Sequence, residues 1–92
     1  MHAVFVVSEL DPSRQAEAET MLKTQIAPRI KQAPGFVKGY WAATLDGSNG
    51  LSLVVFKTKI DAENAAKMVR SNPTPPGVTI TNVEIREVVA EA

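Results

Sequence analysis

Hydrophobic and polar positions recur with two different periods along the chain, and each change of period marks a new element. Residues 2–8 form a run of β-branched and aromatic side chains, which predicts a strand with both faces covered. Because side chains alternate across a strand, Phe5 and Val7 face opposite to Val4 and Val6. Both faces of the sheet that contains this strand are therefore expected to be apolar.

A helix is predicted to begin directly after this strand. Asp11 can accept a hydrogen bond as the N-cap residue, and Pro12 suits the first helical position because its missing N–H is not needed there. Pro28 removes a backbone donor further along, so we expect a kink or break between Thr24 and Arg29. The apolar stripe of this helix, at spacings of three and four, comprises Ala18, Leu22, Ile26, Ile30 and Ala33.

Residues 36–45 and 51–57 are strand-like runs joined by Asp-Gly-Ser-Asn-Gly, which predicts an antiparallel hairpin. Thr58 and Asp61 have the spacing of a capping box at the start of a second helix. A Pro-rich break then leads to a last strand over residues 78–89. The second helix carries a stripe of small side chains, Ala62, Ala65, Ala66 and Val69.

The order of elements is β-α-β-β-α-β over a single domain, residues 1–92. This order predicts an α+β, ferredoxin-like fold with a four-stranded antiparallel sheet backed by two helices. The second sheet face would then lie uncovered, and a monomer seldom exposes an apolar patch of that size. A second copy of the sheet is the simplest cover, so we expect a homodimer.

A five-residue loop fixes the predicted register of the hairpin, with Leu45 opposite Leu51, Trp41 opposite Val55 and Tyr40 opposite Phe56. A loop of another length would shift this pairing. One face of the hairpin is then wholly apolar and carries Trp41, Leu45, Leu51, Leu53 and Val55. The other is mixed and carries Lys38, Tyr40, Ala42, Thr44, Ser52, Val54 and Phe56.

The two faces suggest two roles. The apolar face suits a dry subunit interface, which we expect to bury Trp41, Leu53 and Val55. The mixed face suits a ligand cleft beneath the helices, bounded by Tyr40, Ala42, Thr44, Ser52 and Phe56. The competing interpretation is that Tyr40 and Phe56 are ordinary core residues.

Charge and composition narrow the classes of partner. Ten basic and ten acidic side chains cancel, which argues against a nucleic-acid partner. Without cysteine or a cluster of histidines and carboxylates, no metal site is predicted. No apolar run approaches the roughly 20 residues that span a bilayer, and the first residues lack a basic leader, so we expect no membrane association and a cytoplasmic location.

Few titratable side chains are candidates for a role in the cleft. His2, the only histidine, can serve as a base or remain a solvated residue near the terminus. Arg86 shares a strand face with Glu84, and this pair can contact a ligand or mark an exposed rim. We take His2 and Arg86 as candidate polar contributors and leave the catalytic residues unassigned. The Pro-Thr-Pro-Pro-Gly segment is either a stiff connector or a loop that closes over the cleft.

The combination of PGFVKGYW, a short Asp-Gly turn, LSLVVF, an alanine-rich helix and a closing VEIREVV resembles the dimeric α/β-barrel superfamily, particularly the antibiotic-biosynthesis-monooxygenase-like domains. The resemblance covers nearly the whole chain. It implies two sheets paired face to face into a barrel, and a small ligand held between the sheet and the helices of each subunit.

Haem-degrading members of that superfamily use an asparagine, a tryptophan and a histidine. The place of their tryptophan corresponds here to Phe56, and residues 60–70 contain no histidine, so neither haem nor another cofactor is predicted. The resemblance implies a cofactor-independent monooxygenase acting on a small aromatic or polyketide-like molecule. The alternative is a non-catalytic dimer that binds a small ligand or serves as an interaction module.

Overall fold

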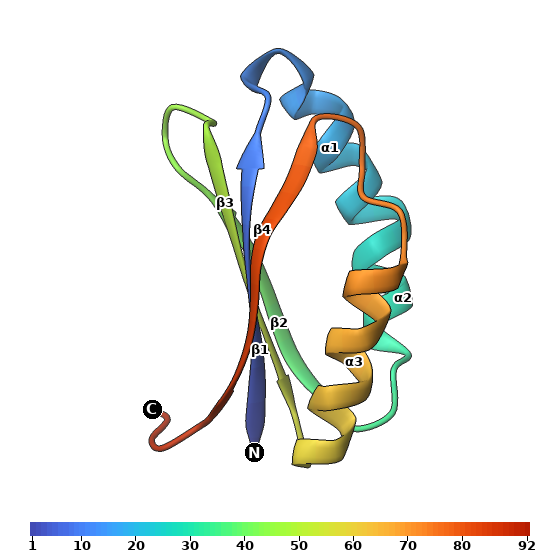
Figure 1. The fold of residues 1–92 in the computed structure, drawn as a ribbon, viewed down its shortest axis with the longest axis vertical. Coiled ribbons are helices and arrows are strands. Elements are labelled where there is room, and N and C mark those ends of the chain that lie inside the picture. The colour runs from blue at the N-terminus through green and yellow to red at the C-terminus, as the bar shows by residue number, and fades with distance from the viewer.

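A computed structural model describes all 92 residues and shows an antiparallel sheet with helices on one face only (Figure 1). Its strands are β1 (His2–Leu10), β2 (Phe36–Ala43), β3 (Asn49–Phe56) and β4 (Val78–Glu87). They are arranged in the order β2-β3-β1-β4. The predicted ferredoxin-like α+β fold is confirmed.

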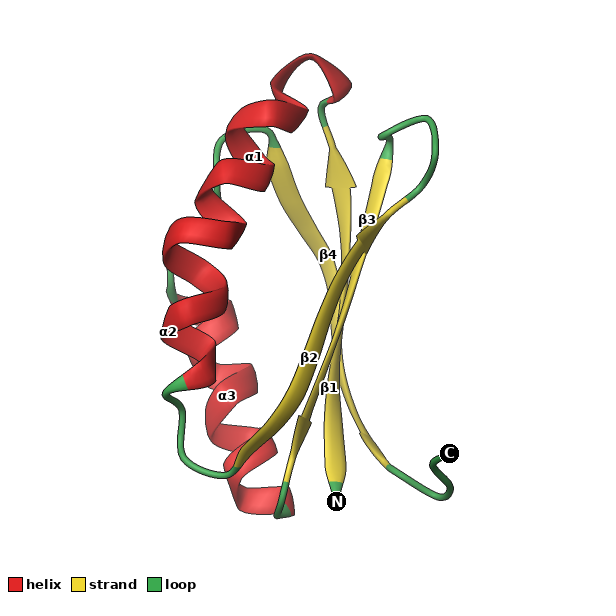
Figure 2. Cartoon of the chain, turned by 180° about the vertical axis from the view of Figure 1, so that it is seen from behind, coloured by secondary structure: helices red, strands yellow, loops and turns green.

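The first helical region is a rod made of four consecutive segments, which continue one another along the sheet (Figure 2). They are η1 (Pro12–Arg14), α1 (Gln15–Met21), η2 (Leu22–Ile26) and α2 (Ala27–Lys31). The second helix is α3 (Lys59–Ser71). None of these helices combines the length and the apolar character needed to cross a membrane.

Both predicted helix starts are capped as expected. The Asp11 carboxylate accepts a hydrogen bond from the backbone N–H of Ser13 at 3.0 Å, and the Thr58 hydroxyl accepts one from the backbone N–H of Asp61 at 3.1 Å. These bonds satisfy donors that a helix leaves free in its first turn.

The predicted irregularity before Pro28 takes the form of a π-helical turn, η2. The N–H of Ala27 donates to the carbonyl of Leu22, five residues back, instead of to the residue four back. Proline cannot donate the next α-helical bond, and the wider turn absorbs that loss. The rod therefore changes its bonding at this point without ending.

The core lies where α3 packs on the sheet. Ala62 and Ala66 are fully buried, and their small side chains bring α3 close to Val4, Val54 and Phe56. Phe56 is 1% exposed and meets the ring of Phe36 edge-on, with centroids 6.4 Å apart. This end of the sheet is tightly filled.

The hairpin register differs from the predicted one. Trp41 pairs with Ser52 instead of Val55, and Tyr40 pairs with Leu53 instead of Phe56, a displacement of three positions. Because three is an odd number, the β2 side chains from Lys38 onward change faces relative to β3.

The turn chemistry explains the displacement. The Asp46 carboxylate accepts hydrogen bonds from the Ser48 N–H at 2.9 Å, the Ser48 hydroxyl at 2.7 Å and the Thr44 hydroxyl at 2.7 Å. The backbone N–H of Thr44 donates to the carbonyl of Asn49, which closes the loop earlier than predicted. Leu45 is thereby left in the loop, fully exposed.

The faces of the sheet follow from this register. Val4 and Val6 of β1 face the helices, and the β3 residues divide as predicted. Those of β2 are interchanged: Trp41 lies on the helix side, whereas Tyr40 lies on the opposite face and is 58% exposed. We call this opposite face, which no element covers in Figure 2, the outer face. Its residues include Ala3, Phe5, Val7, Lys38, Tyr40, Leu51, Leu53, Val55, Glu84 and Arg86.

Asp46→Asn should weaken the hairpin turn in a pH-dependent way. The pKa of Asp46 is lowered from 3.8 to about 2 by three hydrogen bonds. The largest effect comes from the Ser48 side chain, the next from the Ser48 backbone and the smallest of the three from the Thr44 side chain. Because the pKa of Asp46 is lower in the folded state than in the unfolded state, its carboxylate stabilises the folded protein at pH values above the unfolded-state pKa. This contribution is lost as the pH falls toward 2. Thermal unfolding should therefore show a lower Tm for the variant at pH 6 and a shrinking difference from pH 4 downward. A difference that stays constant to pH 2 would contradict this role of the carboxylate.

Candidate functional site

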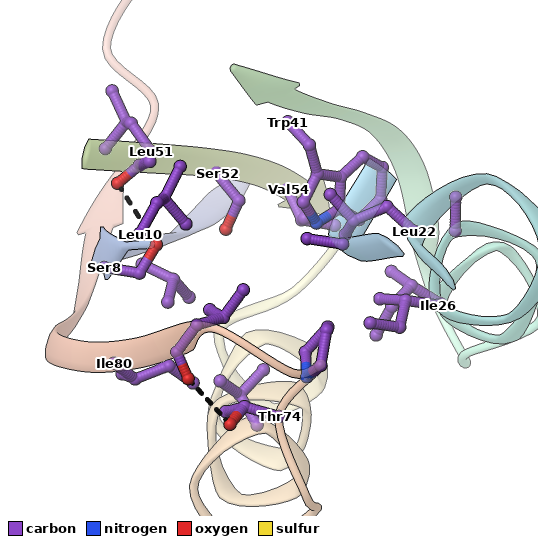
Figure 3. A pocket seen from close by; sticks show the side chains of 18 of the residues that line it. Ser8, Leu10, Leu22, Ile26, Trp41, Leu51, Ser52, Val54, Thr74 and Ile80 are labelled. Atoms are coloured by element: carbon purple, nitrogen blue, oxygen red, sulfur yellow. Dashed lines mark hydrogen bonds between the residues drawn. The ribbon is translucent and has the colours of Figure 1, made fainter. Parts of the chain in front are cut away.

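A cavity of about 520 Å³ lies between the helix side of the sheet and the helical rod (Figure 3). Leu22 and Ile26 line it from η2, and Val54 and Val6 line it from the sheet. The loop between α3 and β4 contributes further lining residues, Pro73, Thr74, Pro75 and Gly77. Of the 32 lining residues 19 are hydrophobic, so the cavity suits a largely apolar ligand.

Trp41 forms one wall of this cavity. It is half-buried, packs against the core cluster and lies near Leu22 in Figure 3. Its position depends on the observed β2–β3 pairing, which puts it on the helix side beside Ser52. The chain's only tryptophan therefore offers a large flat apolar surface to a bound molecule.

Polar side chains in the cavity are few. The Thr74 hydroxyl is engaged, since it donates to the carbonyl of Val78 at 2.9 Å. Ser8 and Ser52 are buried on the sheet floor at 9% and 8% exposure. The hydroxyl of Ser8 lies 3.5 Å from the carbonyl of Gly50, and that of Ser52 has no hydrogen-bond partner in the protein.

The charged lining residues all lie along the rod and are exposed: Asp11, Glu19, Lys23 and Arg29. Hydrogen bonds from the side chain and backbone of Ser13 hold the pKa of Asp11 below its usual value, in keeping with its role as a cap. The charges thus lie on the exposed surface along the rod, and no carboxylate or basic group is buried inside the cavity. The arrangement suits a ligand held by shape and apolar contact, with hydroxyls as its polar partners.

The predicted cleft residues divide into two groups. Ser52 and Phe56 line the cavity, and Ala42 borders it although its pairing with Leu51 puts its side chain on the outer face; Tyr40 and Thr44 do not line it. Tyr40 points to the outer face because of the register, and the Thr44 hydroxyl donates to Asp46 in the loop. The assignment of Tyr40 as a cavity wall is therefore wrong.

The predicted interface residues also divide. Leu53 and Val55 lie on the outer face, as expected from the sequence. Trp41 lies on the other side of the sheet and lines the cavity, so its placement on the interface face is wrong.

Neither candidate polar contributor reaches the cavity. His2 pairs with Phe56 and Glu87 at the far end of β1, and its Nδ1 is buried without a hydrogen-bond partner. Arg86 lies on the outer face, where its guanidinium is 5.6 Å from the centroid of the Phe5 ring and 2.7 Å from the carboxylate of Glu84.

Glu84 is tied to that face as well. Hydrogen bonds lower the pKa of the Glu84 carboxyl. The bond from Arg86 has the largest effect and the bond from Asn82 the next largest. The interpretation of Glu84 and Arg86 as a pair on an exposed rim fits the structure.

Sequence reasoning missed Ser8 and the contribution of η2 to the cavity. Ser8 lies on the same face of β1 as Val4 and Val6. A single polar residue on an otherwise apolar strand face could have indicated a cavity there. Leu22 and Ile26 were assigned only to the apolar stripe of a helix. Their distance from the sheet depends on tertiary packing, which no local pattern records.

Comparison with known proteins supports the fold through structure rather than sequence. No protein-family model and no curated protein sequence matches the chain. Among solved structures, HapK from Hahella chejuensis has a TM-score of 0.73 at 7% identity, over 100% of this chain and 96% of HapK.

Two further solved structures are of proteins with a stated activity. The haem-degrader MhuD from Mycobacterium tuberculosis, with two haems bound, has a TM-score of 0.71 at 16% identity, over 100% of this chain and 99% of MhuD. The monooxygenase ActVA-Orf6 of Streptomyces coelicolor, in complex with Nanaomycin D, has a TM-score of 0.60 at 14% identity, over 99% and 92% of the two chains. The chain therefore shares its fold with HapK, MhuD and ActVA-Orf6 over nearly its whole length.

Proposed function

We propose that the protein is a cofactor-independent monooxygenase that takes a small, flat aromatic or polyketide-like molecule into the cavity beside Trp41. The observation that carries this proposal is the cavity itself, about 520 Å³ in volume and lined mainly by apolar side chains. Its volume lies within the range of roughly 300–1,000 Å³ that small-molecule sites occupy. The similar structures support the class, since one is a monooxygenase and another a haem-degrader.

Haem does not fit this site as a protein-ligated cofactor. The lining contains no histidine and the chain contains no cysteine, so neither imidazole nor thiolate is available to bind the iron there. The only histidine, His2, lies outside the cavity. The proposal therefore assigns no step to haem.

The reaction class follows from what the cavity offers. An aromatic molecule with an acidic hydroxyl or ring methylene can ionise to an electron-rich anion that reduces O2 directly. Oxidation of a ring methylene to a carbonyl then balances, with one O2 consumed and one water released. Since no carboxylate or basic group is buried in the lining, the site suits substrates acidic enough to ionise in water. The apolar walls would orient the ring and exclude bulk water from it.

A second candidate function is non-catalytic binding of the same class of molecule. The absence of a buried base from the cavity lining favours it. Anthrone separates the two candidates, because its ring methylene can be oxidised to the carbonyl of anthraquinone. An oxygenase should consume O2 with anthrone faster than the uncatalysed reaction, whereas a binding protein should leave that rate unchanged.

Trp41→Ala should weaken the binding of anthrone about tenfold or more, because it removes a wall of the cavity. Tyr40→Ala is the matched control, since Tyr40 is the neighbouring aromatic residue on the outer face. Titrations followed by the NMR signals of the Val54 and Leu22 methyl groups give both affinities without relying on tryptophan fluorescence. If only the Tyr40 variant bound anthrone more weakly, and it remained folded, the ligand would lie on the outer face. That result would contradict this proposal.

We also propose that two copies pair through the outer face. Phe5, Leu53 and Val55 form its centre, and Leu51 and Val7 are 48% and 37% exposed in the single chain. Such a patch across neighbouring strands is typical of an interface. Lys38 on β2 and the Glu84–Arg86 pair on β4 place charges of both signs at its margins, which a second copy can complement. The superfamily resemblance implies the same pairing of sheets.

Leu53→Glu should convert the protein to monomer or aggregate, since it puts a charge at the centre of the proposed interface. Ile60→Glu is the control, because Ile60 is 69% exposed on α3, away from the outer face. Sedimentation velocity at micromolar concentration should show a dimer for the wild type and the control only. A wild type that sediments as a stable monomer would remove the basis for the pairing.

A further inference from the structure

Ser52 carries a hydroxyl that lines the cavity, is accessible from it and has no hydrogen-bond partner in the protein. Its side chain lies on the helix side of β3, at 8% exposure, and forms no hydrogen bond within the protein. Figure 3 shows it pointing into the space between the sheet and the opposite wall. The buried side-chain atom without a partner is His2 Nδ1, not the Ser52 oxygen, so the Ser52 hydroxyl is reachable from the cavity and available to a molecule there.

Ser8 places a second hydroxyl beside it. Ser8 pairs with Gly50 and Val6 pairs with Ser52, so the two serines are diagonal neighbours on the same face of adjacent strands. Side chains so related lie about 7–8 Å apart or less and are within reach of one ligand edge. The contact of Ser8 with the Gly50 carbonyl, at 3.5 Å, is longer than an ordinary O–H···O bond.

Gly50 keeps the space in front of Ser8 open. A Cβ atom at this position would lie 2.8 Å from the Ser8 hydroxyl oxygen and 3.4 Å from Leu10. The backbone of Gly50 is not in the left-handed region, so its conformation alone does not require glycine. The missing side chain therefore matters for the space that it leaves beside the hydroxyl.

The two serine hydroxyls therefore lie toward one end of a cavity whose lining is otherwise mainly apolar. Ser8 and Ser52 lie on the opposite side of Figure 3 from Leu22 and Ile26. The latter two, with Trp41 and Val54, offer only carbon surface and one indole N–H. A ligand that is apolar throughout would leave the Ser52 hydroxyl without a partner and the Ser8 hydroxyl with only its long contact to the Gly50 carbonyl, at a cost in affinity.

We propose that Ser8 and Ser52 select ligands with a carbonyl or phenolic oxygen at one edge of an apolar ring system. They orient the ring with that edge toward Gly50 and its carbon body toward Trp41 and Ile26. This inference rests on the proposed function only in taking the cavity as a site for small ring systems. It adds the polarity of the ligand and its direction in the cavity.

The test compares 1,4-naphthoquinone with naphthalene, which share a bicyclic carbon skeleton and differ in the two carbonyl oxygens. Affinities of both are measured by NMR titration for the wild type, the double variant Ser8→Ala/Ser52→Ala, and Ser71→Ala. Ser71 is the control, since its exposed hydroxyl donates to the carbonyl of Lys67 at the end of α3. The double variant should bind 1,4-naphthoquinone about tenfold more weakly and naphthalene unchanged or slightly more tightly.

The comparison separates failure of this inference from failure of the proposed function. Equal weakening of both ligands would show a loss of shape instead of a loss of hydrogen bonds, and would overturn the inference. Unchanged binding of 1,4-naphthoquinone by the double variant would overturn it as well, while leaving the cavity as a binding site. If the wild type binds neither molecule, the proposed function fails and the inference fails with it.

Discussion

The pairing of β2 with β3 is the constraint on which the site depends. It places Trp41 opposite Ser52, on the side of the sheet that faces the helical rod. A shift by one residue would send Trp41 to the outer face and bring Tyr40 beneath the helices. The cavity would then lose its aromatic wall, and the outer face would gain a tryptophan. The lining of the cavity and the composition of the outer face are thus determined by the same ladder of backbone hydrogen bonds.

Two local features of the hairpin fix that pairing. At one end, Asp46 gathers three hydrogen bonds from Ser48 and Thr44 and closes the loop at Thr44 and Asn49. At the other end, the register shifts at Val37, so that Phe36 still meets Phe56 on the helix side. The irregularity lets two aromatic residues of β2, Phe36 and Trp41, share a face although five positions separate them.

The helices divide the space above the sheet unequally. The alanines of α3 allow a close approach and fill one end, whereas η2 presents Leu22 and Ile26 across an open cavity. Only 12 of the 92 residues are buried, which leaves apolar surface both in the cavity and on the outer face. A bound ligand and a second copy would each cover one of these surfaces. A small chain has more to gain from such burial than a large one.

The sequence predicted the fold well because the fold depends on local signals. The caps at Asp11 and Thr58, the small stripe of α3 and the alternation in β1 can each be recognised within a few residues. The irregularity before Pro28 follows from the chemistry of one side chain.

The site was predicted less well because it depends on register. The choice between Tyr40 and Trp41 as cavity wall was decided by the side-chain hydrogen bonds of Asp46 and by the irregularity at Val37, and neither is encoded in the hydrophobic pattern. Ser52 and Phe56 were placed correctly because the parity of β3 was assigned independently of the loop.

The most direct test of this account is the set of nuclear Overhauser contacts made by the indole protons of Trp41. The observed register predicts contacts with protons of Gly39 and with the methyl groups of Val54 on the helix side of the sheet. Contacts with Leu53, Val55 or Phe5 instead would place Trp41 on the outer face. That result would contradict the cavity, its ligand and the orientation proposed for it.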